Sequence, residues 1–112
     1  MKLKRLLPSL RDKKRYIVFE LIAKGGLDYN MAKKGIKESI SWLIGELGMA
    51  KAGLRFLDEW KNNKGIITVN RSYVDETRVG MSLVKNISNI DVIVRTVGVS
   101  GILKKAKARF FN

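Results

Sequence analysis

The sequence contains no cysteine, no histidine and only one proline, Pro8, among its 112 residues. Without cysteine the chain can form neither a disulfide framework nor a thiolate nucleophile, and a zinc site of the usual type needs cysteine or histidine. Without histidine it also lacks the ordinary acid–base catalyst at neutral pH. These absences exclude the common forms of thiol, zinc and histidine chemistry.

Long apolar runs are also missing. No stretch is long enough to span a bilayer, and the charged residues 1–15 lack the apolar centre of a signal peptide. We therefore expect a cytoplasmic protein with no membrane association. The length is typical of a single domain, and a hydrophobic fraction of 46% is sufficient for a packed core.

Acidic residues are few compared with basic ones. Lys and Arg number 23 and Asp and Glu number 10, which gives a formal net charge of +13. Residues 1–15 carry a net charge of +6 and residues 95–112 carry +5, so the middle of the chain carries only +2. Repulsion among these charges destabilises a compact domain unless a polyanion neutralises them. The clustering favours a nucleic acid over a membrane surface or a basic surface without a partner.

Hydrophobic spacing predicts one mixed domain of strands and helices. Residues 15–24 alternate between two faces at period two, as a strand does. Residues 30–47 have the spacing of a helix that stops at Gly48, with an apolar stripe of Ile36, Ile40, Leu43, Ile44 and Leu47. Residues 53–60 and 65–71 are predicted as two strands of a hairpin, joined by the polar turn segment 61–64. The remaining elements are predicted as a strand over 90–97 and helices over 74–88 and 100–111.

The first six of these elements match the split βαβ arrangement, so the predicted class is α+β. We expect a ferredoxin-like, RRM-like βαββαβ sandwich with a four-stranded antiparallel sheet, order 4-1-3-2, and an additional C-terminal helix. The single domain would comprise a basic arm (1–13), the core (14–98) and a basic C-terminal helix (99–112). In this order the first and last strands are antiparallel neighbours, so the two basic ends of the chain meet in one patch.

That patch supplies the candidate RNA-binding residues. Its bases suit a phosphate backbone, and the amides around Ser100 and Gly101 can hold a phosphate just before the last helix. A simple strand-to-helix turn with Ser100 as the N-cap is the alternative. The candidates are Arg11, Lys13, Lys14, Arg15, Arg95, Ser100, Gly101, Lys104, Lys105, Lys107 and Arg109.

Aromatic residues suited to base stacking are scarce on the two central strands. RNA-recognition motifs stack bases there, but the first strand offers only Tyr16 and Phe19, on opposite faces, and residues 65–71 offer none. We predict that Phe19 is a core residue. The face that carries Val18 and Ile22 is too apolar for water, which suggests a protein partner. Sequence-specific reading of single strands is therefore not expected.

The acidic residues form no catalytic pattern. Asp58 and Glu59 are adjacent and point to opposite faces of a strand, whereas Asp75 and Glu76 suit the first turn of a helix. No catalytic triad, phosphate loop or dinucleotide signature occurs. We therefore assign no catalytic or metal-binding residue. A self-sufficient nuclease that uses Asp58 or Asp91 is the alternative.

Three stretches of the sequence resemble one known family. Residues 7–17 (LPSLRDKKRYI), 45–52 (GELGMAKA) and 95–101 (RTVGVSG) are similar, in this order, to the archaeal ribonuclease P protein component 2 family, which is related to a subunit of the eukaryotic ribonuclease P/MRP enzymes. The resemblance implies a non-catalytic RNA-binding subunit of a tRNA-processing ribonucleoprotein. In that endonuclease, a hydrolase, the RNA removes 5′ leaders from precursor tRNA with Mg²⁺.

The resemblance also implies partners. They are ribonuclease P RNA, precursor tRNA through indirect contact, and ribonuclease P protein component 3, and two such protein pairs are expected to assemble through this subunit. Mg²⁺ is used by the RNA, and no cofactor is expected on the protein itself. Another RNA-binding ribonucleoprotein module, such as a ribosome-associated protein, is the alternative function.

Overall fold

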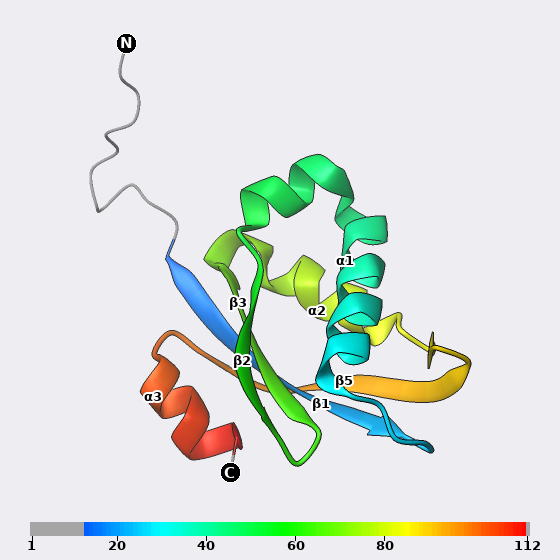
Figure 1. Cartoon of the computed structure of the whole chain (residues 1–112). Coiled ribbons are helices and arrows are strands. Elements are labelled where there is room, and N and C mark those ends of the chain that lie inside the picture. Colours follow the sequence, from blue (N-terminus) through cyan, green and yellow to red (C-terminus); the bar gives the residue numbers. More distant parts are fainter. Residues whose placement is uncertain (1–12, 112) are drawn as a thin grey trace.

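One antiparallel sheet with the strand order β2-β3-β1-β5-β4 organises the computed structural model, which describes residues 13–111 (Figure 1). Two helices, α1 and α2, cover one face of this sheet, and the C-terminal segment lies on the other. The strands are β1 (Lys14–Ala23), β2 (Arg55–Lys61), β3 (Lys64–Asn70), β4 (Asn86–Ile87) and β5 (Ile90–Ser100). The helical elements are α1 (Tyr29–Ala52), η2 (Arg71–Tyr73), α2 (Val74–Ser82), α3 (Leu103–Ala106) and η3 (Lys107–Phe111).

The α+β class and the order of the four long strands are confirmed. The predicted hairpin is present too, and its turn residues Asn62 and Asn63 both have positive φ, which asparagine tolerates better than most residues. The prediction of a four-stranded sheet is incomplete, because the short strand β4 pairs with the start of β5. The sheet is therefore not a clean four-stranded ferredoxin-like sheet.

The predicted helix over 74–88 is too long. α2 ends at Ser82, and the chain then enters β4. Met81, Val84 and Ile87 are all buried, so the apolar spacing of the helix continues beyond its end. The sequence therefore does not reveal the strand. The spacing of apolar residues indicates which residues are buried, but it does not distinguish a helix from a short strand that follows it.

Helix α1 is longer than predicted and is interrupted. Asp28 caps its first turn by accepting a hydrogen bond from the Met31 amide at 2.8 Å. The expected stop at Gly48 is wrong, because the helix continues to Ala52 and is capped by Gly53, whose φ is +60°. The interruption occurs at Gly45, where φ is +75° and glycine carries little steric cost.

The interruption also changes the face that α1 buries. Ile36 and Ile40 are fully buried, as the apolar stripe predicts. Leu43 and Leu47 were expected in the same stripe, but they are 37% and 70% exposed. The helix is interrupted at Gly45. Residues near and after the interruption therefore no longer lie on the helix face that packs against the sheet in the first turns.

The main core lies between the sheet and the two helices. Ile17, Phe19 and Leu21 of β1 pack there against Ile36 and Ile40 of α1. Full burial of each such side chain contributes about 1.5–3 kcal/mol relative to exposure. Phe19 is thus confirmed as a core residue and is not available to stack a base.

A second, smaller core lies on the opposite face of the sheet. Val18 and Ile66 are fully buried there beneath Ala106 and Phe111 of the C-terminal segment. The expectation that a protein partner covers Val18 is therefore wrong, because the chain covers it with its own C-terminus. Ile22, near the far end of the same strand, remains 47% exposed.

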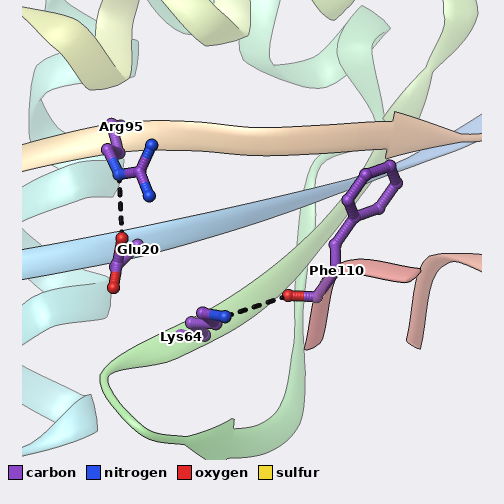
Figure 2. A network of polar contacts seen from close by, with 4 residues as sticks. All are labelled: Glu20, Lys64, Arg95 and Phe110. Atoms are coloured by element: carbon purple, nitrogen blue, oxygen red, sulfur yellow. Dashed lines mark hydrogen bonds and ion pairs between the residues drawn. The ribbon is translucent and has the colours of Figure 1, made fainter. Parts of the chain in front are cut away.

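Glycine at position 98 allows the C-terminal segment to dock. A Cβ atom there would lie 2.4 Å from the Phe110 ring, which reaches over β5 (Figure 2). The Lys64 ammonium donates a hydrogen bond to the Phe110 carbonyl at 3.2 Å, and Lys107 forms an ion pair with Glu59 of β2. The segment is therefore held by ring packing and by polar contacts to the β2–β3 hairpin.

Replacing Gly98 by alanine tests this docking. The added methyl group would overlap the Phe110 ring, so we expect the free energy of unfolding to fall by about 1–3 kcal/mol, measured by chemical denaturation. In a Phe110→Ala background the same substitution should be much less destabilising, because the obstructing ring is gone. Equal destabilisation in both backgrounds would contradict the close packing.

Candidate nucleic-acid interface

Six basic residues gather at one end of the sheet, where β1 starts, β3 ends and β2 starts. Lys14 of β1 pairs with Asn70 of β3, and the Arg71 amide donates a hydrogen bond to the Lys13 carbonyl at 2.7 Å. The start of β1 therefore lies beside η2. We call these six residues the basic corner: Lys13, Lys14, Arg15, Lys51, Arg55 and Arg71.

The end of α1 joins the same corner. The Lys14 ammonium donates to the Gly53 carbonyl at 3.4 Å, and the side-chain amide of Asn70 donates to the Lys51 carbonyl at 2.6 Å. Gly53 ends α1, and Arg55 begins β2 two residues later. The fold thus brings basic residues from separate parts of the sequence to one place.

The charges of the basic corner are not neutralised within the part of the chain that the structure describes. Two ion pairs occur there, Arg95 with Glu20 and Lys107 with Glu59, and neither includes a basic-corner residue. All six residues are exposed except Arg15, which is half-buried. Cations without a neighbouring carboxylate keep their attraction for an external polyanion. The corner therefore suits a phosphate backbone.

The structure brings only some of the predicted site residues to this end. β1 and β5 are antiparallel neighbours, as expected, and a Cβ on Gly101 would lie 3.3 Å from the Arg15 guanidinium. Arg95, however, pairs with Glu20 further along the sheet, and their side chains form an ion pair at 2.8 Å (Figure 2). The strand order was right, but Arg95 lies away from the start of β1.

Ser100 contacts its own loop. It ends β5, and its hydroxyl accepts a hydrogen bond from the Ile102 amide at 3.1 Å. The interpretation of Ser100 as a helix N-cap is wrong, because Ile102 occupies that position and α3 begins at Leu103. The α-helical part has only four residues, so a phosphate site would depend on the loop amides and not on a long helix.

The C-terminal bases differ in their surroundings. Lys104, Lys105 and Arg109 are exposed, whereas the ammonium of Lys107 lies 2.5 Å from a carboxylate oxygen of Glu59. The hydrogen bond from Lys107 lowers the pKa of the Glu59 carboxyl. Lys107 therefore anchors the C-terminal segment, and the other three remain candidates for RNA contact. Arg11 and the rest of the predicted arm before Lys13 lie outside the described residues.

Sequence reasoning missed Lys51, Arg55 and Arg71. They lie in the middle of the chain, where the positive and negative charges nearly cancel when charges are counted by segment. A signal for Arg71 was present, because in the predicted sheet order the end of β3 lies beside the start of β1. Nothing comparable marks Lys51, since the predicted helix stopped before it.

An aromatic contact holds the start of α1 against the edge strand β2. The Tyr29 hydroxyl donates a hydrogen bond to the Leu57 carbonyl, and its ring stacks on Trp60 with centroids 4.7 Å apart. Burial raises the pKa of Tyr29 to about 12, and the negative charges of Asp58 and Glu59 act in the same direction. Tyr29 is thus a neutral structural group near an acidic stretch of β2.

The described residues contain no group of three or more histidine, cysteine or carboxylate side chains placed to bind a metal ion. None of the described helices is long and apolar enough to cross a membrane.

Known proteins similar to this chain include one family and several curated relatives. The family model described as the Rpp14/Pop5 family matches residues 15–111. The chain is 39% identical to ribonuclease P protein component 2 of Pyrococcus abyssi, covering 100% of this chain and 96% of the relative. The protein of that name from Thermococcus gammatolerans is 42% identical, over 96% of this chain and 90% of the relative. The protein of that name from Archaeoglobus fulgidus is 35% identical, over 98% of this chain and 99% of the relative.

A solved structure is also similar in fold. A chain in the cryo-EM structure of yeast ribonuclease MRP matches with a TM-score of 0.54 and 12% identity, over 81% of this chain and 76% of that chain. At this identity the likeness concerns the fold alone. The family resemblance indicated by three short stretches of sequence is thus confirmed over nearly the whole chain.

Proposed function

Because this chain belongs to the Rpp14/Pop5 family, we propose that it is a protein subunit of ribonuclease P, which binds and stabilises the catalytic RNA during 5′-leader removal from precursor tRNA. The observation that carries the proposal is the near-complete match to relatives named ribonuclease P protein component 2. The basic corner supports it, since a subunit that stabilises RNA needs exposed positive charge, and the corner residues form no ion pair among residues 13–111.

The proposed mechanism is electrostatic. A compact RNA brings phosphates close together, and their repulsion is reduced where Lys and Arg replace diffuse counterions. Base stacking on the sheet is disfavoured, because the C-terminal segment covers Val18 and Ile66 on the face that RNA-recognition motifs use. We therefore propose binding along the phosphate backbone through the basic corner, extended by Lys104, Lys105 and Arg109.

The remaining parts of the proposal follow from the family. The RNA with Mg²⁺ performs the hydrolysis as an archaeal-type cytoplasmic endonuclease, and the protein contributes no catalytic group and no cofactor. Precursor tRNA is contacted indirectly. Ribonuclease P protein component 3 is the proposed protein partner, and two such pairs assemble through this chain.

Salt dependence tests whether the basic corner binds phosphates. Replacing Lys51, Arg55 and Arg71 by glutamine should flatten the plot of log affinity against log salt by roughly 2–3 units of slope, because about three phosphate contacts are lost. Fluorescence anisotropy with ribonuclease P RNA at several KCl concentrations measures the slope.

A matched control separates the site from net charge. Replacing the exposed Lys34, Lys37 and Lys85 by glutamine removes the same charge elsewhere on the surface and should leave the slope nearly unchanged. An equal effect of both triple variants would mean that the RNA responds to overall charge and is not bound at the basic corner.

The Mg²⁺ requirement of RNA-catalysed cleavage tests the function itself. Reconstituted with the RNA and its other protein subunits, the wild-type chain should lower the Mg²⁺ concentration needed for precursor cleavage, because protein cations replace part of the metal's screening. The Lys51, Arg55 and Arg71 glutamine variant should lose this effect, and the Lys34, Lys37 and Lys85 variant should keep it. An unchanged Mg²⁺ requirement with the wild-type chain, together with tighter binding to ribosomal RNA, would favour a ribosome-associated role instead.

A further inference from the structure

The two edges of the sheet are built differently. One edge is β2, in which four of seven residues (RFLDEWK) are charged and whose pairing with β3 shifts register between Phe56 and Trp60. Charges and bulges on an edge strand hinder the addition of further strands. The β2 edge therefore has the features of a protected edge.

The opposite edge belongs to β5 and is covered only at its start. β4 pairs with Ile90 and Asp91, and the Lys85 carbonyl accepts a hydrogen bond from the Val92 amide at 3.0 Å. From Ile93 onward, β5 pairs with β1 on its inner side, and no strand among the described residues pairs with its outer side. This free stretch, IVRT, contains one charged residue, no lysine and no proline.

The free hydrogen-bonding groups of this edge have a definite direction. Because the Val92 amide points toward β4, the alternation of a strand directs the amides and carbonyls of Val94 and Thr96 to the same outer side. After Thr96 the register with β1 shifts, which ends the regular stretch. Val94 and Thr96 thus offer a ladder site for a short extended segment.

A groove accompanies this edge on the helical side of the sheet. Its volume is about 490 Å³, and Val79 in its wall is 49% exposed. The α2 residues that line it share the spacing i, i+3, i+4, i+7 and so form one stripe of the helix. The lining residues are Asp75, Arg78, Val79 and Ser82 of α2 and Val94, Arg95 and Thr96 of β5.

The opposite side of the edge presents an arginine side chain. Val94 belongs to the core beneath the helices, so its neighbour Arg95 projects from the other face of the sheet, where it meets Glu20. The Arg95 side chain is still 58% exposed beside that carboxylate. A strand added at this edge would therefore meet Val79 and Val94, set among polar residues of the groove, on one face and the ion-paired Arg95 on the other.

We propose that the free edge of β5 is a docking site for an extended acidic segment of another protein, which adds as a strand along Val94 and Thr96. Alternate residues of the segment are apolar toward Val79 in the groove and acidic toward Arg95. Backbone hydrogen bonds supply affinity in this mode, and the alternate side chains supply specificity. The proposal concerns a protein partner and does not depend on the proposed RNA-binding function.

A second copy of this chain fits the edge less well. Antiparallel pairing of Val94 with Thr96 of a second copy places Arg95 directly opposite its counterpart, and like charges in that position are destabilising. The net charge of +13 on each copy adds a repulsion that this short edge is poorly suited to offset, whereas the proposed assembly of two protein pairs would use another surface. An acidic segment avoids both costs and partly neutralises the chain.

The probe is a blocked eight-residue peptide that alternates valine and glutamate, titrated into the full chain and followed by amide NMR. We expect the amides of Val94 and Thr96 to gain protection from hydrogen exchange. A peptide N-methylated on the edge-facing amides should bind at least about tenfold more weakly, since each lost hydrogen bond contributes roughly 1 kcal/mol. Thr96→Pro, which removes an outward amide without removing a bond to β1, should have the same effect.

Charge exchange and a control variant complete the test. The Arg95→Glu variant should bind the valine–glutamate peptide more weakly than the wild type does, and it should prefer a valine–lysine peptide. The Lys51, Arg55 and Arg71 glutamine variant should bind the glutamate peptide as the wild type does, which separates this edge from the basic corner. The proposal is overturned if peptide contacts map to the basic corner alone or if N-methylation changes nothing. It is also overturned if sedimentation detects a dimer of the free chain in which the Val94 and Thr96 amides are already protected.

Discussion

Strand β1 lies between β3 and β5 and is buried on both faces through its centre. Three consecutive residues, Ile17, Val18 and Phe19, are fully buried, although neighbours on a strand point to opposite sides. That burial requires a layer on each face of the sheet: α1 and α2 on one, the C-terminal segment on the other. The position of β1 thus fixes where each functional surface can form.

Consequences of this position appear at both sides of the molecule. At the start of β1, the pairing with β3 brings Lys13 and Lys14 beside Arg71, and the α1–β2 connection adds Lys51 and Arg55. On its other side β1 pairs with β5 and leaves β5 with an outer edge that β4 covers only briefly. The same strand therefore separates a positively charged end, suited to RNA, from an edge suited to an extended polypeptide.

The C-terminal segment decides how RNA can approach the sheet. By packing Phe110 on Gly98 and burying Val18 and Ile66, it replaces solvent on the face that an RNA-recognition motif offers to bases. The lysine and arginine side chains remain on the surface around this segment. Binding through phosphates, without reading of the nucleotide sequence, is the mode that this arrangement favours.

Much of the architecture was predictable because strong periodicities follow from burial. The alternation over 15–24, the polar hairpin turn and the helical stripe around Ile36 gave the class and the order of the long strands. β4 was not predictable, since its buried residue Ile87 continues the spacing of α2, and neither was the break at Gly45, which depends on one backbone conformation.

The candidate site was predictable only in part, for a similar reason. Counting charges along the chain finds Lys13 to Arg15, because these residues are consecutive. It cannot find Lys51 and Arg55, which reach the corner through the path of α1 and the loop that ends at β2. Counting charges also selects Arg95 and Lys107 as RNA contacts, although each forms an ion pair with a carboxylate that is remote in sequence. The partners are Glu20 and Glu59.

The absence of cysteine permits a direct measurement of where the RNA lies. An iron–EDTA group can be attached to a single introduced cysteine, at Arg71→Cys in the basic corner or at Lys37→Cys on the exposed side of α1. The two proteins are then bound to ribonuclease P RNA, and hydroxyl-radical cleavage of the RNA is mapped. We expect strong, localised cleavage from position 71 and little from position 37. Equal cleavage from both positions, or cleavage from position 37 alone, would contradict binding of the RNA at the basic corner.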